Sequence, residues 1–132
     1  MYTTACSSSR DKVLIVEDNR AMSLLLSHIL SSHFEVISFT NALPAFSYLK
    51  KNEPDILITD YLLPDLDGYG FVKNIYQNGL LPHIPIFMVT GLSPAQIPDD
   101  LDTFNVKEVI HKPFNPEMLV QKIFNVLETI RI

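Results

Sequence analysis

The sequence predicts an α/β fold, a single doubly wound five-stranded parallel sheet with helices on both faces. Five short runs rich in Val, Ile and Phe recur along the 132 residues. Several runs are apolar without interruption, as strands buried on both faces require. Segments with the helical spacing of apolar residues separate the runs, and strands that alternate with helices are typical of this fold class.

The strand candidates are short and close to equal in length. They are KVLIV (12–16), EVISF (35–39), DILIT (55–59), PIFMV (85–89) and EVIH (108–111). By analogy with other doubly wound sheets of this size, we expect the strand order 2-1-3-4-5. That order places a binding site at the carboxyl ends of the first and third strands.

Four of the intervening or terminal segments indicate helices. In 19–32 the apolar residues form an i, i+3, i+4, i+7, i+8 stripe, which consists of Met22, Leu25, Leu26, Ile29 and Leu30. The second helix, 41–51, starts with Asn41 as its cap, and the third, 68–79, stops at Gly79. The last, 115–132, starts with Asn115 as cap and Pro116 in its first turn.

The fourth connection, 93–105, is the weakest helical candidate. Pro98 interrupts a helix, and three aspartates follow it closely. We therefore expect a short or irregular helix there.

Composition excludes several classes of protein. Hydrophobic residues make up 47% and charged residues 19%, as in a globular domain. No apolar run reaches the roughly 20 residues of a membrane span, and the net charge of -5 argues against direct nucleic-acid binding. We expect residues 1–10 to be a flexible tail and 11–132 the folded domain. Cys6, the only cysteine, allows no internal disulfide, which is compatible with a reducing, cytoplasmic location.

Polar residues gather where the predicted strands end. Glu17 and Asp18 follow the first strand, Asp60 the third, Thr90 the fourth, and Lys112 the fifth. Three carboxylates in one cleft repel one another unless a cation lies among them. Such an oxygen-rich site suits Mg²⁺, and the hydroxyl and the ammonium would face an anion beside the metal. The pattern predicts a phosphoryl site with Asp60 as the nucleophile.

Four motifs at the strand ends resemble one known family over about residues 11 to 131. They are LIVEDN, ILITDYLLPDLDGYGFV, IPIFMVTG and VIHKPF. In this order they resemble the receiver, or phospho-acceptor, domain of two-component response regulators. The resemblance implies a flavodoxin-like sheet, a histidine kinase or histidine phosphotransfer protein as partner, and phosphorylation that switches protein–protein contacts. It implies a phospho-accepting module rather than a conventional enzyme, acting alone or within a larger hybrid protein.

The resemblance also implies a metal site. Asp60 would accept the phosphoryl group and, with Asp18, ligate Mg²⁺ or alternatively Mn²⁺. The backbone carbonyl of Leu62 would be the third protein ligand, and Glu17 would act through metal-bound water.

Four further positions match the family pattern. Thr90 would donate to a phosphoryl oxygen, and Lys112 would pair with the phosphoryl group or with Asp60. Pro113 matches a cis peptide that aims the lysine, and Gly68 would allow a close approach into the third helix.

Some positions depart from the family pattern, mainly on the side that receivers use for output. Val109 stands where an aromatic switch residue is usual, so the Thr–aromatic coupling has no ring to move. Asn105 and Val106 replace a usual Gly-Ala pair, although Asn tolerates the left-handed backbone. Gly91 stands where alanine is frequent and could loosen its loop.

Leu62 and Leu92 flank the path of the hydrolytic water in this family, and neither can orient a water molecule. We therefore predict slow loss of the phosphoryl group.

Other interpretations remain open from the residues alone. Glu17 or Asp18 could cap the first helix, and Asp65 and Asp67 are interpreted as turn and cap residues. A flavin-binding protein would need a different loop after the first strand, and an aspartyl-phosphate hydrolase would need an acid in place of Leu62. A pseudo-receiver that serves only as a binding scaffold is the main alternative. The histidines show no ligand spacing and are interpreted as structural or surface residues; they are His28, His33, His83 and His111.

Overall fold

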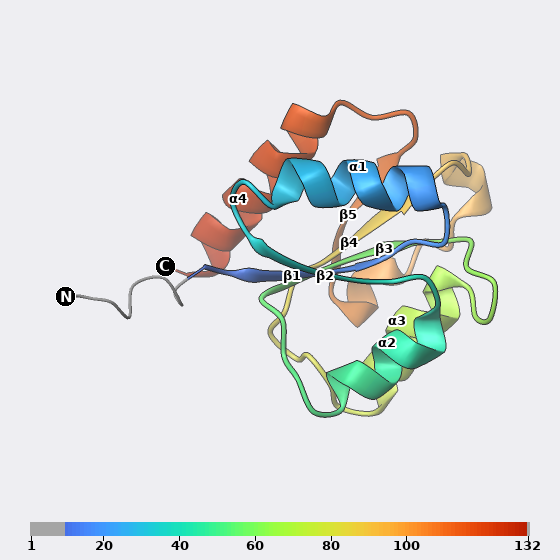
Figure 1. Cartoon of the computed structure of the whole chain (residues 1–132). Coiled ribbons are helices and arrows are strands. Elements are labelled where there is room, and N and C mark those ends of the chain that lie inside the picture. The colour runs from blue at the N-terminus through green and yellow to red at the C-terminus, as the bar shows by residue number, and fades with distance from the viewer. Residues whose placement is uncertain (1–9, 132) are drawn as a thin grey trace.

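The computed structural model describes residues 10–131, and all but Arg10 of the expected tail over 1–10 lies outside them. A parallel sheet forms the centre (Figure 1), and its strand order β2-β1-β3-β4-β5 confirms the predicted topology. The strands are β1 (Lys12–Val16), β2 (Glu35–Phe39), β3 (Ile56–Asp60), β4 (Ile86–Thr90) and β5 (Val106–His111). β3 and β4 therefore lie one residue later than predicted, so that Asp60 and Thr90 are the last residues of their strands.

Helices cover both faces of the sheet. In Figure 1, α1 (Arg20–Leu30) and α4 (Pro116–Ile130) lie on one side, and α2 (Ala42–Leu49) and α3 (Gly68–Gln77) lie on the other. Two short 3₁₀ turns, η2 (Pro94–Gln96) and η3 (Leu101–Phe104), replace a helix between β4 and β5. The expectation of an irregular fourth connection is confirmed.

β1 shows why the strands read as continuous apolar runs. Val13 and Ile15 belong to the core layer under α1 and α4, whereas Leu14 and Val16 belong to the layer under α2 and α3. All four side chains are fully buried. Because successive side chains point to opposite faces, a strand covered on both sides has no position for a polar residue until it ends.

The cap of α2 differs from the prediction. Asn41 precedes the helix, but its side chain makes no capping bond and accepts instead from Thr40. Both carboxylate oxygens of Asp65 accept from the first turn, at 2.9 Å from the N–H of Ala42 and 2.8 Å from that of Leu43. A residue distant in sequence therefore performs the capping that we assigned to Asn41.

The other helix starts follow ordinary capping rules. Asn19, not Asp18, caps α1 by accepting from Met22 at 2.9 Å. Asp67 caps α3, and Asn115 caps α4, as expected. Asp18 is therefore not committed to a capping bond.

Some apolar residues of the helices lie outside the core. Leu25 of the predicted stripe is exposed, as are Tyr76 of α3 and Ile130 of α4, although each of these helices also has buried apolar residues. No helix within residues 10–131 has the length and apolarity that crossing a membrane would require.

Candidate functional site

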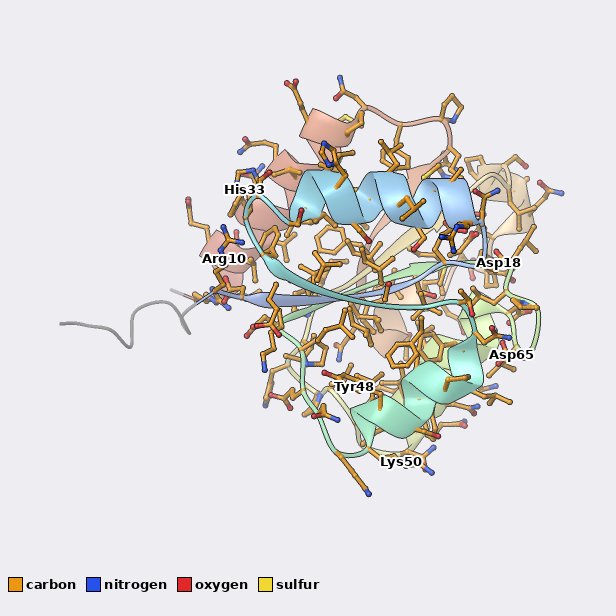
Figure 2. The ribbon with its side chains drawn as sticks, viewed as in Figure 1. Arg10, Asp18, His33, Tyr48, Lys50 and Asp65 are labelled. Carbon is orange, nitrogen blue, oxygen red and sulfur yellow. The ribbon has the colours of Figure 1, made fainter. Side chains whose placement is uncertain are left out.

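Strand register places three acids at the same edge of the sheet. β1 and β3 pair with Val16 opposite Thr59, so Glu17 and Asp60 are the next residues of neighbouring strands. One carboxylate oxygen each from Glu17, Asp18 and Asp60 lies within 4.8 Å of the others. Glu17 and Asp60 are buried, and Asp18 is exposed at this edge, at the opposite end of the sheet from Arg10 (Figure 2).

Lys112 reaches these acids from the end of β5. Its Nζ lies 3.1 Å from Oε1 of Glu17 and 3.2 Å from Oδ2 of Asp60. The backbone N–H of Lys112 donates to the carbonyl of Thr90 at 2.7 Å, and the Lys112–Pro113 peptide bond is cis, as the resemblance implies. One ammonium group therefore bridges two buried carboxylates.

Burial and the charges in this cluster shift the pKa values of Glu17 and Lys112. Burial raises the pKa of Glu17, and nearby Asp60 raises it further, although the N–H of Asn19 donates to Glu17 and opposes the shift. Burial alone would lower the pKa of Lys112, but its hydrogen bond to Glu17 and the charges of both acids outweigh burial and raise it. Three carboxylates against one ammonium leave an excess of negative charge.

The donor set fits a hard divalent cation. Carboxylate oxygens are the ligands that Mg²⁺ and Mn²⁺ prefer, and the cluster of Glu17, Asp18 and Asp60 supplies three of them on neighbouring chain segments. Two of the three are held rigidly because they are buried at strand ends. The group could therefore bind a metal ion through its exposed side.

Asp60 has a defined orientation. Its Oδ1 accepts from the N–H of Tyr61 at 2.7 Å, and its Oδ2 pairs with Lys112. Gly68 packs directly behind it, since a Cβ there would lie 2.5 Å from the carbonyl oxygen of Asp60 and 2.9 Å from Cα of Tyr61. The Gly68 N–H also donates to the carbonyl of Tyr61 at 2.6 Å, which closes the β3–α3 loop as expected.

Thr90 ends β4 with a fully buried side chain. Its Oγ1 accepts from the N–H of Leu92 at 3.0 Å. Within residues 10–131 the hydroxyl proton of Thr90 has no acceptor that satisfies hydrogen-bond geometry, although a buried donor normally has one. The group is therefore available to an added acceptor.

The remaining predicted residues occupy distinct surroundings. Leu62, two residues after Asp60, is 58% exposed, so most of its side chain faces solvent. Val109 is half-buried against the core layer under α2 and α3. Asn105 adopts the left-handed conformation, with φ 69°, that the sequence allowed for it.

Sequence reasoning missed two kinds of contact at this site. The backbone N–H groups of Asn19 and Tyr61 fix carboxylates, and no side-chain pattern reports such donors. The structure agrees with the interpretation of His111 as a structural residue, but its partner was not predicted: its Nδ1 lies 2.8 Å from the carbonyl oxygen of Leu92.

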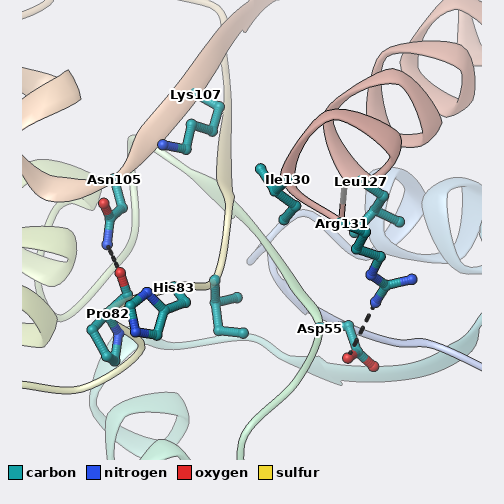
Figure 3. Close-up of a pocket in the computed structure, with 9 residues that line it drawn as sticks. Asp55, Pro82, His83, Asn105, Lys107, Leu127, Ile130 and Arg131 are labelled. Atoms are coloured by element: carbon teal, nitrogen blue, oxygen red, sulfur yellow. Dashed lines mark hydrogen bonds and ion pairs between the residues drawn. The ribbon is translucent and has the colours of Figure 1, made fainter.

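A cavity of about 470 Å³ lies at the opposite edge of the sheet from the acids, where β3 and β5 begin. Figure 3 shows the residues that line it. Its lining includes Asp55, His83 and Lys107, and Arg131 reaches Asp55 at 3.5 Å. Asp55 directly precedes β3 and Asp60 ends it, so the cavity is separate from the acid cluster.

Comparisons with known proteins agree with this geometry. A family model for the response regulator receiver domain matches residues 13–124. The chemotaxis protein CheY homolog of Campylobacter jejuni is 32% identical over 122 residues, which cover 89% of this chain and 93% of that protein. The chemotaxis response regulator CheY4 of Vibrio cholerae superposes with a TM-score of 0.81 at 27% identity, over 89% of this chain and 99% of that one.

Another relative is much longer. The hybrid signal transduction histidine kinase D of Dictyostelium discoideum is 26% identical over 87% of this chain, but the chain spans only 7% of that kinase. The family match covers most of the described residues, and the CheY homolog is matched over nearly its full length. The chain therefore belongs to the family of response regulator receiver domains, which act in two-component signalling.

Proposed function

We propose that Asp60 accepts a phosphoryl group from a phosphohistidine of a histidine kinase or a histidine phosphotransfer protein. A carboxylate oxygen of Asp60 attacks phosphorus, the P–N bond breaks, and its electron pair returns to the imidazole, which then takes up a proton. The product on this chain is an acyl phosphate.

One observation carries this proposal. Asp60 is buried at the end of β3 while Lys112 contacts its Oδ2 and two further carboxylates lie within 4.8 Å. An aspartate with only a structural role gains nothing from additional like charges nearby, because they destabilise its ionised form. A cluster of this composition suits a cation and a phosphoryl group together.

The neighbouring residues have complementary roles. Asp18 and Asp60, with the carbonyl of Leu62 and with Glu17 through water, would hold Mg²⁺ or Mn²⁺, which supplies charge neutralisation for the phosphoryl oxygens. Lys112 pairs with Asp60 before transfer and with the phosphoryl group afterwards. The buried hydroxyl of Thr90, whose proton lacks an acceptor among residues 10–131, donates to a phosphoryl oxygen.

Phosphorylation would then change the contacts that this domain makes with other proteins. Val109 offers no ring to rotate, so the link from Thr90 to the output surface must use other groups. We expect the segment between β4 and β5 to carry that change, because its two 3₁₀ turns lack the continuous hydrogen bonding of an α-helix.

Incubation with acetyl phosphate and Mg²⁺, followed by intact mass measurement, tests the proposal. We expect one phosphoryl adduct on the wild-type chain and none on Asp60→Asn. Asp102→Asn removes an exposed acid on η3, outside the cluster, and should leave the adduct unchanged. No adduct from acetyl phosphate or from a phosphorylated partner would support the scaffold alternative instead.

A further inference from the structure

The loop that follows β4 is held through both backbone groups of Leu92. The N–H of Leu92 donates to Oγ1 of Thr90 at 3.0 Å, and its carbonyl oxygen lies 2.8 Å from Nδ1 of His111. Gly91, which lies between Thr90 and Leu92, is exposed, and a Cβ there would have no neighbour within 4 Å. Glycine gives the loop much conformational freedom, so these two hydrogen bonds restrict a segment that is otherwise loosely held.

The chemistry of the contact fixes the state of the histidine. A carbonyl oxygen can only accept, so Nδ1 of His111 must carry the proton. His111 is the register partner of Thr90 in the β4–β5 pair. The end of β5 therefore holds the end of β4 twice, through His111 to Leu92 and through the Lys112 N–H to the carbonyl of Thr90 at 2.7 Å.

These contacts determine how the Thr90 hydroxyl is oriented. Oγ1 of Thr90 accepts from the N–H of Leu92, which restricts the orientation of the side chain. The hydroxyl proton, for which the described residues offer no acceptor, is thereby held in a limited set of directions. If the carbonyl of Leu92 were released, the freedom of Gly91 would allow the Leu92 N–H to leave Oγ1. The hydroxyl would then lose its fixed direction.

We propose that His111 is a positioning residue for Thr90, which acts through the backbone of Leu92 to direct the Thr90 hydroxyl toward the phosphoryl group. The proposal rests on the function proposed above, since it concerns regulation of the same site. Among residues 10–131, the side chain of His111 makes no hydrogen bond or ion pair with the acid cluster; its hydrogen bond is to the loop.

Two substitutions at one position test the contact. His111→Asn keeps an N–H donor close to the place of Nδ1, whereas His111→Leu removes the donor with a similar volume. Amide hydrogen exchange of Leu92 in the unphosphorylated protein should be about two- to tenfold faster in His111→Leu, the range expected for one hydrogen bond. His111→Asn should exchange at about the wild-type rate. His111→Ala repeats the comparison in case the leucine side chain displaces the loop.

The rate of phosphorylation by acetyl phosphate should also distinguish His111→Leu from His111→Asn. We expect His111→Leu to slow adduct formation at Asp60 by about two- to tenfold, and His111→Asn to restore it. His111→Leu and His111→Asn are then each combined with Thr90→Val, a substitution that removes the hydroxyl at nearly constant volume. If His111 acts through Thr90, His111→Leu has no further effect on the rate in that background.

The outcomes separate the two proposals. Unchanged exchange of Leu92 in His111→Leu, or an Nδ1 without a proton in nitrogen NMR, would overturn the contact. Equal slowing by His111→Leu with and without the Thr90 hydroxyl would show a merely structural role. If the wild-type chain forms an adduct and His111→Leu matches its rate, only the positioning role fails. If the wild-type chain forms none, the proposed function and the positioning role fail together, whatever the exchange of Leu92 shows.

Discussion

Asp60→Asn should stabilise the metal-free protein while it removes the proposed phosphoryl acceptor. The carboxylate of Asp60 is repelled by Glu17 and Asp18, whose nearest oxygens lie within 4.8 Å, and attracted by Lys112 at 3.2 Å. At an effective dielectric constant of about 20, each repulsion is at least about 3.5 kcal/mol and the attraction is about 5 kcal/mol. The repulsions exceed the attraction by about 2 kcal/mol, and solvent around the exposed Asp18 reduces this to about 1 to 2 kcal/mol.

Mg²⁺ should reverse the order of stability of the wild-type chain and Asp60→Asn. A ligand that binds only the folded state at about 100 times its Kd adds about 2.7 kcal/mol to the free energy of unfolding. The wild-type chain should gain this stability, whereas Asp60→Asn lacks one carboxylate of the cluster and should gain much less. At saturating Mg²⁺ the wild-type chain should therefore be more stable than the variant by about 1 kcal/mol.

Urea denaturation with and without Mg²⁺ measures both free energies. Asp102→Asn serves as the matched control, because it removes an exposed negative charge at the other end of β5 and should show the wild-type response to Mg²⁺. The reasoning is refuted if Asp60→Asn is less stable than the wild-type chain in the absence of metal. It is equally refuted if the variant keeps the full Mg²⁺ effect, because Asp60 would then not be a ligand.

Four other substitutions give separate tests. Gly68→Ala should lower the free energy of unfolding by about 1–3 kcal/mol, because its Cβ would meet backbone atoms of Asp60 and Tyr61. Gly91→Ala has open space around its Cβ and should raise the free energy of unfolding by about 0.4–1 kcal/mol. Urea denaturation that ranks the two variants the other way would contradict this reasoning. Asp65→Ala should cost about 1 kcal/mol at neutral pH because two capping bonds of α2 are lost. Slight burial acts to raise the pKa of Asp65, but the backbone N–H groups of Leu43 and Ala42 outweigh it and lower that pKa. The stabilisation by Asp65 is therefore complete above its ordinary pKa of 3.8 and is lost as the pH falls through the lower pKa of the folded state. The wild-type chain and Asp65→Ala should therefore have similar free energies of unfolding at acid pH. Leu62→Asn should shorten the lifetime of the acyl phosphate by about tenfold, because an amide can orient a water where the exposed leucine cannot, and an unchanged lifetime by intact mass would contradict the role of Leu62.

The sheet and the acid cluster could be predicted from the sequence because both depend on strand ends. β1 buries Val13 and Ile15 toward one face and Leu14 and Val16 toward the other, so the first polar residue after it marks the edge of the sheet. Once the order of strands is known, parallel register places Glu17 beside Asp60 without any further information. The apolar pattern of each strand and the rule for the order of the strands are therefore sufficient to predict the sheet and the acid cluster.

The contacts that were missed join segments far apart in sequence. Asp65 caps α2 from the loop before α3, although Asn41 stands at the local capping position. His111 bonds Leu92 across 19 residues, and nothing in either segment indicates the pairing. A hydrogen bond to a backbone group leaves no complementary side chain in the sequence, so only coordinates reveal it.

The acid cluster and the loop after Thr90 are held in place by different kinds of contact. Asp60 and Glu17 are fixed by buried strands, and moving them would disturb core packing on both faces of the sheet. The loop after Thr90 is fixed by two hydrogen bonds of Leu92 and leads into 3₁₀ turns. Each such bond contributes about 1 kcal/mol, a small cost beside that of repacking a core. If Asp60 is phosphorylated as proposed, a change at that group can therefore spread through the loop at low cost, while Asp60 itself stays in place.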